Sequence, residues 1–247
     1  MGLRARTAHA CNVLLAPLGA QLVSRSRVEE LKPWDETFRS WIVEAKAKNQ
    51  DPNDVGDVAW GGGPLDQSFL CRRYLDFVTP DSVVLELGPG TGRITRHVVS
   101  CCREMILVDY SQVVCDWIAE YLRGKGRHRI HKLDGPVLSA VTDTSVDLVI
   151  AHGVFEHIDL DDLVCFLEEF HRVLKPGGHV SFNFDNIMTT QGRQWFHRYR
   201  GKPGTRCIFR FYHPDVVRFL SEAAGFSVHE LITDASRFAH IVLRKAS

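Results

Sequence analysis

Short runs of apolar residues recur through the middle of the chain, and segments that we interpret as helices separate them. Apolar runs without strict alternation are typical of strands that are buried on both faces of a parallel sheet. The alternation of strands and helices through residue 184 therefore predicts a doubly wound, mostly parallel α/β sheet. The first three expected strands lie at residues 83–87, 105–109 and 130–134.

The end of the chain predicts a helix followed by two strands. Residues 214–224 have helical spacing, and Gly225 ends that helix as a C-terminal glycine should. Residues 226–233 and 238–243 then read as two strands joined by a short turn at 234–236. A further helix is expected at residues 66–77, leading into the first strand.

Residues 1–65 are expected to form an N-terminal helical extension that ends in the loop 60–64, and residues 66–247 the main domain. Trp34, Phe38 and Trp41 are spaced four and three residues apart, so they share one helix face. We favour the interpretation that this face packs on the domain. The alternative is an aromatic lid over a ligand cleft, to which Trp60 could also belong, and both can hold for different rings.

Composition narrows the classes of function. Thirty basic and thirty acidic residues give a formal net charge of zero, which argues against broad electrostatic binding to nucleic acid. The seven cysteines form no C-x-x-C pair and no cluster with zinc spacing, so we expect reduced thiols, a cytoplasmic protein and no metal site.

No apolar run is long enough to span a membrane, so no membrane association is expected. The first 28 residues contain no acid and carry four arginines, a composition that also suits an organelle presequence. We favour an amphipathic helix of the mature protein for this segment.

A glycine-rich turn follows the first expected strand. Gly88, Gly90 and Gly92 let the backbone turn tightly and approach a ligand closely, because no Cβ is in the way. The dinucleotide fingerprint is G-x-G-x-x-G, whereas the spacing here is G-x-G-x-G, with Glu86 two residues before the first glycine. The pattern therefore predicts a nucleotide-type site without the dinucleotide spacing.

The second expected strand ends in an acidic residue at a sequence distance from this turn that suits ribose binding. Asp109 lies about 20 residues past the glycines, where a carboxylate can accept hydrogen bonds from both ribose hydroxyls. Ser111 is placed to cap the next helix. NAD enzymes share an acid at this place, so Asp109 alone does not select the cofactor.

These features resemble the class I S-adenosylmethionine-dependent methyltransferase superfamily, in particular the type 11/25-like small-molecule methyltransferases. The glycine turn resembles its motif I, residues 147–158 resemble its fourth strand and following loop, and residues 174–184 resemble its L-K-P-G-G helix end and fifth strand. The resemblance covers residues 66–245 and implies a Rossmann-like seven-stranded sheet whose last strand is antiparallel beside the fifth.

The resemblance also implies S-adenosyl-L-methionine as the cofactor and a set of residues that hold it. These are Glu86, Gly88, Gly90, Gly92, Asp109, Tyr110, Asp134, Gly135 and His152. In this family an acid at the place of Asp134 often accepts a hydrogen bond from the adenine amino group. His152 departs from the small or amide residue of most relatives, which makes it a candidate catalytic base as well as a candidate cofactor neighbour.

The segments added to the core of the domain should determine which acceptor is methylated. The insertion 192–214 is the most informative of them. This insertion interleaves aromatic side chains with six basic residues, Arg193, Arg198, Arg200, Lys202, Arg206 and Arg210. Guanidinium groups suit a carboxylate or phosphate, so an anionic small-molecule acceptor is one interpretation. We favour a small molecule methylated at oxygen or nitrogen by a monomer or homodimer.

Two alternatives stay open. A tRNA methyltransferase would use the basic and aromatic insertion to grip phosphates and bases. A non-catalytic partner protein would bind the cofactor without turnover. A DNA or protein-amide methyltransferase usually carries an Asn/Asp-Pro-Pro-aromatic run after the fourth strand, and residues 151–154 read Ala-His-Gly-Val instead, so no DNA partner is expected.

Overall fold

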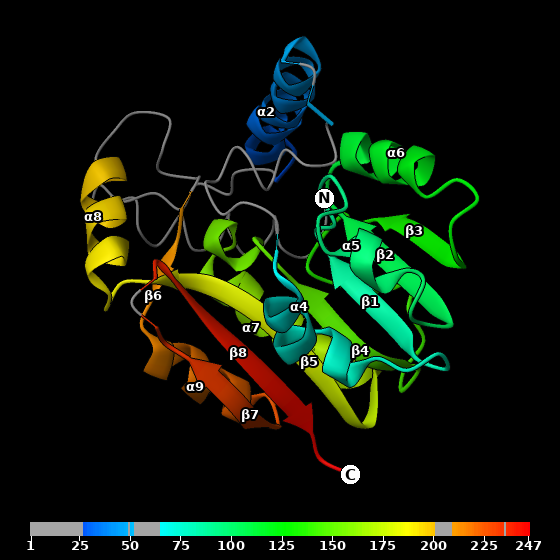
Figure 1. Cartoon of the computed structure of the whole chain (residues 1–247). Coiled ribbons are helices and arrows are strands. Elements are labelled where there is room, and N and C mark those ends of the chain that lie inside the picture. The colour runs from blue at the N-terminus through cyan, green and yellow to red at the C-terminus, as the bar shows by residue number, and fades with distance from the viewer. Residues whose placement is uncertain (1–26, 49, 52–64, 201–208, 235) are drawn as a thin grey trace, which may run out of the picture.

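The computed structural model describes residues 27–48, 50–51, 65–200, 209–234 and 236–247, with backbone only for 27–33. A single twisted sheet forms its centre, in the strand order β3-β2-β1-β4-β5-β8-β7 (Figure 1). The parallel strands are β1 (Val83–Leu87), β2 (Glu104–Asp109), β3 (His128–Lys132), β4 (Val146–Ala151) and β5 (Leu174–Asn186). This is the mostly parallel Rossmann-like sheet that the sequence predicted.

The other end of the sheet is antiparallel. Strand β8 (Phe238–Lys245) runs antiparallel to both β5 and β7 (Phe226–Ile232), so the last strand is inserted beside β5 as expected. A short additional strand, β6 (Phe211–Tyr212), pairs with the end of β5 outside the main order. The predicted seven-stranded path is confirmed, and β6 extends it to eight strands.

Two hydrophobic cores hold the sheet, one on each face. Side chains alternate along β1, so that Leu85 belongs to the core under α7 (Leu160–Val173) and α9 (Pro214–Ala223). Val84 belongs to the opposite core, under α4 (Gln67–Arg73), α5 (Thr95–Val98) and α6 (Gln112–Tyr121). Burial on both faces explains why the central strands read as apolar runs.

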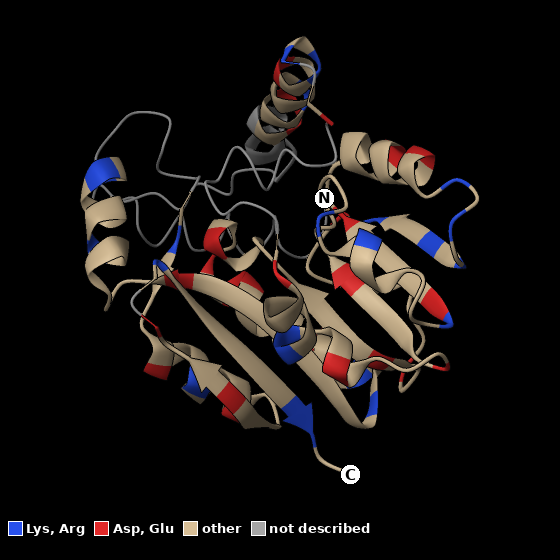
Figure 2. Ribbon diagram, viewed as in Figure 1, with Lys and Arg blue, Asp and Glu red and all other residues tan. Residues whose placement is uncertain are grey.

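Helix caps fix where several helices begin. The Ser111 hydroxyl accepts the Val114 N–H at 3.1 Å at the start of α6, as predicted. His213 Nδ1 accepts the Asp215 N–H at 3.1 Å, at the start of α9. Acidic and basic residues are interspersed over the helices that Figure 2 shows, in keeping with the zero net charge.

Three expected elements differ from the structure. The helix expected at 66–77 is divided into α4 and the 3-10 turn η3 (Leu75–Phe77), because Tyr74 leaves helical geometry with φ −137°. Strand β3 ends at Lys132, two residues before Asp134. Residues 133–145 form turns rather than a helix, so the alternation of strand and helix fails between β3 and β4.

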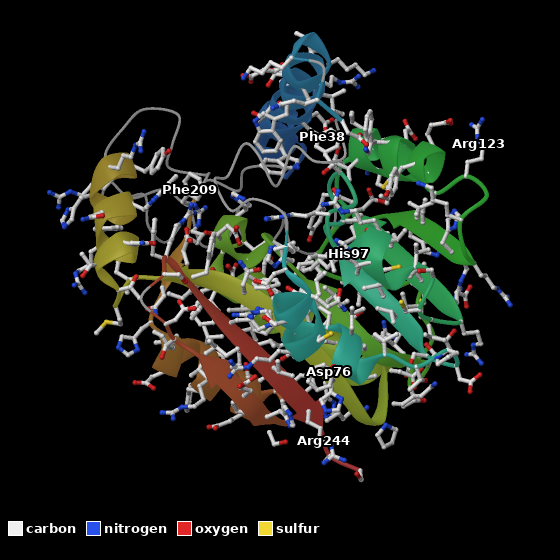
Figure 3. All side chains as sticks on the ribbon, viewed as in Figure 1. Phe38, Asp76, His97, Arg123, Phe209 and Arg244 are labelled. Atoms are coloured by element: carbon white, nitrogen blue, oxygen red, sulfur yellow. The ribbon has the colours of Figure 1, made fainter. Side chains whose placement is uncertain are left out.

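The helix α2 (Arg27–Ala47) stands above the carboxyl edge of the parallel strands, beside α6 (Figure 1). Phe38 is 1% exposed and packs with Ile42 against Val114 of α6, and Figure 3 shows Phe38 between the two helices. For Phe38 the packing interpretation therefore holds. Trp60 and most of residues 1–28 lie outside the described residues.

Candidate functional site

The glycine turn lies at the carboxyl end of β1, between the ends of β2 and β4. Gly88, Gly90 and Gly92 have φ values of 68°, 54° and 90°, a region that favours glycine because other residues pay a Cβ clash there. The Gly88 N–H donates to the Val108 carbonyl at 2.9 Å, which ties the turn to β2. The three glycines are therefore required by the backbone, as the sequence indicated.

The glycines differ in what surrounds them. A Cβ on Gly88 would lie 2.6 Å from Val154 Cγ2, and one on Gly92 would lie 3.1 Å from Ile118 Cδ1, so both sit against protein. A Cβ on Gly90 would meet no atom of the described residues within 4 Å. The backbone at Gly90 is thus open to close approach from outside the chain, which fits a ligand cradle.

Glu86 is the buried acid beneath this turn. Its side chain accepts the Thr95 hydroxyl proton at 2.7 Å, and the residue is 2% exposed. Burial raises the pKa of Glu86 to about 7, and the hydrogen bond from Thr95 opposes that rise only in part. A donor from a bound ligand would stabilise the charged carboxylate at this position.

Asp109 ends β2 and is 8% exposed. The Ser111 N–H donates to its Oδ1 at 2.8 Å. Burial raises the pKa of Asp109 to about 7, and the nearby Asp35 on α2 raises it further. The Ser111 hydroxyl also donates to Asp35, so α2 brings a second carboxylate to the expected ribose position.

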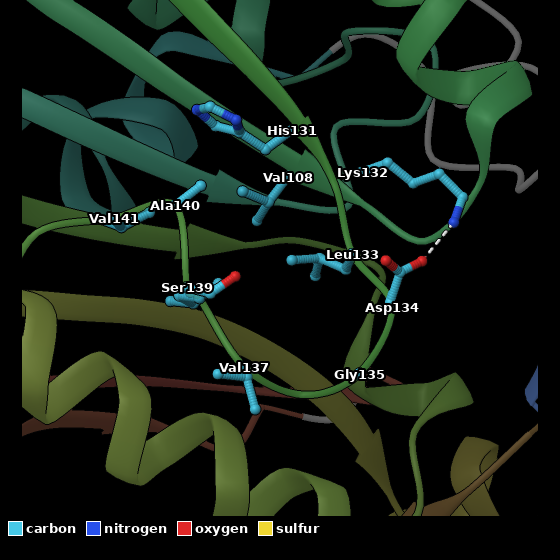
Figure 4. Close-up of a pocket in the computed structure, with 11 residues that line it drawn as sticks. Val108, His131, Lys132, Leu133, Asp134, Gly135, Val137, Ser139, Ala140 and Val141 are labelled. Carbon is cyan, nitrogen blue, oxygen red and sulfur yellow. Dashed lines mark hydrogen bonds and ion pairs between the residues drawn. The ribbon is translucent and has the colours of Figure 1, made fainter.

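Tyr110, Asp134 and Gly135 lie around the neighbouring strand ends. The ring of Tyr110 packs edge-on against Phe166 at 6.3 Å. Asp134 has a 91% exposed side chain and an ion pair with Lys132 at 2.7 Å. Asp134 and Gly135 form part of the lining of a cavity of about 180 Å³, which Figure 4 shows between the 133–141 segment and β2; its lining is Val108, His131, Lys132, Leu133, Asp134, Gly135, Val137, Leu138, Ser139, Ala140 and Val141.

His152 follows β4 directly, at the same edge. Its Nδ1 lies 2.8 Å from the Tyr74 hydroxyl oxygen, and its ring packs edge-on against Phe69 at 5.9 Å. Tyr74 is fully buried, and burial raises the pKa of its phenol so that it keeps its proton. The imidazole is therefore fixed in place by two residues of the α4 segment.

A second group of polar side chains, which the sequence analysis did not predict, lies past the ends of β4 and β5. Glu156 in η4 (Phe155–His157) is 6% exposed, and Asp185 near the end of β5 is fully buried. Arg237, just before β8, donates to both carboxylate oxygens of Asp185 at 2.6 Å. These residues are far apart in the sequence. The pairing of β5 with β8 brings Arg237 to Asp185, and η4 with Glu156 packs against β5.

Three of the four described basic side chains of the insertion have partners within the protein. The Arg210 guanidinium pairs with Asp159, Arg193 donates to the Met188 carbonyl, and the Arg198 guanidinium lies 5.6 Å from the centre of the Trp195 ring. Lys202 and Arg206 lie outside the described residues. Arg193, Arg198 and Arg210 thus contribute to the structure of the insertion itself.

The described residues contain neither a metal-binding cluster nor a membrane-spanning helix. Among these residues no group of three or more His, Cys, Asp or Glu side chains is arranged to hold a metal ion. Within the same ranges no helix combines the length and the apolar character needed to cross a membrane.

Comparisons with known proteins agree with this geometry. Residues 85–180 match a family model described as a methyltransferase domain, numbered type 12, whereas the sequence had suggested types 11 and 25. A protein of Oceanobacillus iheyensis named as an uncharacterized methyltransferase is 24% identical over 167 residues, which cover 66% of this chain and 76% of that protein.

Solved structures share the fold. A SAM-dependent methyltransferase of Methanosarcina mazei is 17% identical with a TM-score of 0.59, over 69% of this chain and 95% of its own. The N-methyltransferase NodS of Bradyrhizobium japonicum, solved with S-adenosyl-L-homocysteine, is 16% identical with a TM-score of 0.56, over 73% of this chain and 85% of its own. The sheet order, the glycine turn and the family match lead to one assignment: residues 85–180 form a methyltransferase domain, on the fold of the S-adenosylmethionine-dependent methyltransferases, whose cofactor is S-adenosyl-L-methionine.

Proposed function

We propose that this chain transfers a methyl group from S-adenosylmethionine to the oxygen or nitrogen of a small-molecule acceptor. The observation that carries the proposal is the open backbone at Gly90 between two buried acids, Glu86 and Asp109. Both carboxylates have pKa values raised to about 7 by burial, so each would be stabilised by donors that a ligand supplies.

Each end of the cofactor has candidate residues at this edge of the sheet. Glu86 and the three glycines would hold the methionine end, and Asp109 with Tyr110 would hold the ribose. Asp134 and Gly135, at the rim of the apolar cavity, would hold the adenine. The bound cofactor supplies a sulfonium methyl group, whose transfer needs little from the protein beyond alignment and exclusion of water.

His152 is the residue that we propose to take a proton from a hydroxyl acceptor. This role requires a particular tautomer. When the Tyr74 hydroxyl donates to Nδ1, Nε2 carries the ring proton and cannot accept another. When Nδ1–H donates to the Tyr74 oxygen, Nε2 carries no proton and has the lone pair that a base needs, and the imidazolium formed keeps the same hydrogen bond.

The formal net charge of zero supports a small molecule rather than tRNA as the methyl acceptor. So do the protein partners of Arg193, Arg198 and Arg210, because charges that already have a partner contribute less to phosphate binding. No disulfide joins any two of the described cysteines, which supports a reducing, cytoplasmic setting.

Calorimetric titration with S-adenosylmethionine and with NAD tests the proposal. We expect saturable binding of S-adenosylmethionine and none of NAD; the reverse result would refute the site. Turnover is then followed as S-adenosylhomocysteine formed with a metabolite extract. Cofactor binding without turnover would favour a non-catalytic partner, and turnover that needs tRNA and falls steeply with salt would favour a tRNA methyltransferase.

A further inference from the structure

One carboxylate oxygen of Glu156 is buried, and the described part of the chain offers it no hydrogen-bond donor. The residue is 6% exposed, and its Oε2 makes no hydrogen bond to any residue that the structure describes. Leaving a buried carboxylate oxygen unsatisfied costs free energy, because the oxygen has lost its water and gained nothing in return. Such an atom in a site region suggests that a ligand supplies the missing donor.

The charges around Glu156 are unbalanced. Asp185 faces Arg237 in a two-bond ion pair, and the charge of Glu156 raises the pKa of Asp185. Burial brings both acids to pKa values of about 7. Two buried carboxyl groups therefore share one guanidinium, and the cluster lacks one positive charge when both are ionised.

A row of aromatic rings connects this cluster with α2 and α8 (Thr190–Tyr199). Trp34 on α2 lies 5.1 Å from His157, His157 lies 5.5 Å from Phe209, and Phe209 lies 5.8 Å from Trp195 on α8. Figure 3 shows Phe209 in the space between these two helices. We call Trp34, His157, Phe209 and Trp195 the aromatic row.

Arg237 connects the aromatic row with the two buried acids, Glu156 and Asp185. Its guanidinium carbon lies 4.1 Å from the centre of the Trp195 ring and 4.7 Å from that of Phe209. The same guanidinium donates to Asp185, so the rings and the acids form one structure. His157, which follows Glu156 directly, is itself a member of the row.

The cluster also lies close to the proposed cofactor cradle. A Cβ on Gly153 would lie 3.6 Å from Glu156 Oε1, and the next residue, Val154, lies against Gly88 of the glycine turn. The loop 152–155 thus contacts the glycine turn through Val154 and lies beside the Glu156 carboxylate at Gly153. An acceptor held at Glu156 would be next to the methyl donor.

We infer that Glu156 and the aromatic row form the acceptor site, and that the acceptor carries a protonated amine on an aromatic or apolar body. This inference rests on the proposed function, since it names the acceptor class of that same site. The ammonium supplies both the missing donor and the missing positive charge, and the rings cover the body of the molecule. The ammonium is the anchor, whichever atom receives the methyl group.

This inference replaces the anionic acceptor that the basic insertion suggested. Arg193, Arg198 and Arg210 are engaged with protein groups, whereas Glu156 has an oxygen without a partner among the described residues. A carboxylate on the acceptor would repel the buried acids.

Three probes that share a phenylethyl body and differ in their polar end test the inference: 2-phenylethylamine, 2-phenylethanol and 3-phenylpropanoate. Binding is measured at pH 8, where Glu156 is ionised, with the protein saturated by S-adenosylhomocysteine. Tryptophan fluorescence gives the readout, since Trp34 and Trp195 lie in the row. We expect the amine to bind at least about tenfold more tightly than the alcohol, and the acid to bind least, because hydrogen bonds to charged groups are worth ~1.5–3 kcal/mol.

Three variants distinguish the effect of the Glu156 charge from a general loss of structure. Glu156→Gln keeps the shape and should remove the preference for the amine, whereas Glu168→Gln, at an exposed site on α7, should keep it. Trp34→Leu should weaken the binding of all three probes to a similar extent. Melting curves check that each variant is folded.

Several results would overturn the inference. These are a preference for the acid, an unchanged preference in Glu156→Gln, or no binding of any probe. A failure of the proposed function looks different: S-adenosylhomocysteine would not bind, and the probes, titrated without it, would still report on Glu156.

Discussion

The Tyr74 hydroxyl oxygen lies 2.8 Å from His152 Nδ1, across a contact between the end of α4 and the end of β4. Tyr74 is also the residue that breaks the expected helix, with φ −137°. The irregular backbone at Tyr74 lies where its side chain reaches the proposed catalytic histidine. The interaction makes the chemistry of His152 depend on a residue outside the glycine motif.

We predict that His152→Ala lowers methyl transfer by about 10²–10⁴-fold and leaves cofactor affinity nearly unchanged, as expected for loss of a general base. His152→Gln should be as slow, because an amide cannot take the proton. Kinetics with the identified acceptor and titration with S-adenosylmethionine measure the two effects. A Gln variant that keeps most of the rate would show that His152 only orients the acceptor, and a collapse of affinity would make it a binding residue.

We predict that Asp109→Ala weakens S-adenosylmethionine binding by about 1.5–3 kcal/mol, the usual worth of hydrogen bonds to a charged group. Calorimetry measures the change. Asp116→Ala on the outer side of α6, which is exposed, serves as the matched control and should bind normally. Unchanged affinity in Asp109→Ala would place the ribose elsewhere.

Glu86 should make the protein without ligand less stable as the pH rises. Its pKa is about 7 in the folded state against an ordinary value of 4.5, so the folded state holds the proton more tightly. Between these values the folded state binds more protons than the unfolded state, and stability falls with increasing pH. The difference across this window corresponds to about 3 kcal/mol for Glu86.

Urea unfolding at pH 5 and pH 8 measures this effect. The loss of stability between the two values should be smaller in Glu86→Gln, which keeps a side chain able to interact with Thr95. Glu168→Gln should match the parent protein. An equal loss in Glu86→Gln and the parent would mean that Glu86 is ionised throughout.

Phe38→Ala should release α2 from α6, because Phe38 is 1% exposed and sits in the small core that joins the two helices. Loss of a buried phenylalanine costs about 3–5 kcal/mol when the site is fully packed. We expect faster amide exchange in residues 34–47, with weaker cofactor binding through the lost Asp35–Ser111 contact. Arg39→Ala, on the exposed side, should change neither, and unaltered exchange in Phe38→Ala would show that α2 docks by other contacts.

The glycine turn and the buried strands could be predicted from sequence because local chemistry determines them. A positive φ at Gly88, Gly90 and Gly92 and the apolar run of β1 are properties of neighbouring residues. The end of β3 and the missing helix after it could not be predicted in this way. There the turns at 133–145 depend on packing, with Leu138 and Val141 entering the core under α7.

The parts of the site that the sequence did not reveal all join distant segments. Asp35 reaches Ser111 from α2, and Tyr74 reaches His152 from α4. Glu156 was not among the residues that the sequence predicted to form the site. Its oxygen without a partner among the described residues, and the ion pair of Asp185 with Arg237 beside it, appear only in the folded structure.

The central claim is that the open backbone at Gly90 receives S-adenosylmethionine, and a comparison of two glycines tests it most directly. Gly90 and Gly124 both have positive φ, 54° and 75°, and within the part of the chain that the structure describes a Cβ on either would meet nothing within 4 Å. Alanine at each position therefore carries a similar backbone strain of about 1–2 kcal/mol. Only Gly90 lies in the proposed cradle.

Calorimetric titration of S-adenosylmethionine into the parent protein, Gly90→Ala and Gly124→Ala is the decisive measurement. The account predicts saturable binding to the parent, the same affinity in Gly124→Ala, and a loss of at least about tenfold in Gly90→Ala, or at least about 1.4 kcal/mol. No binding to the parent protein, or equal affinity in the two alanine variants, would contradict it.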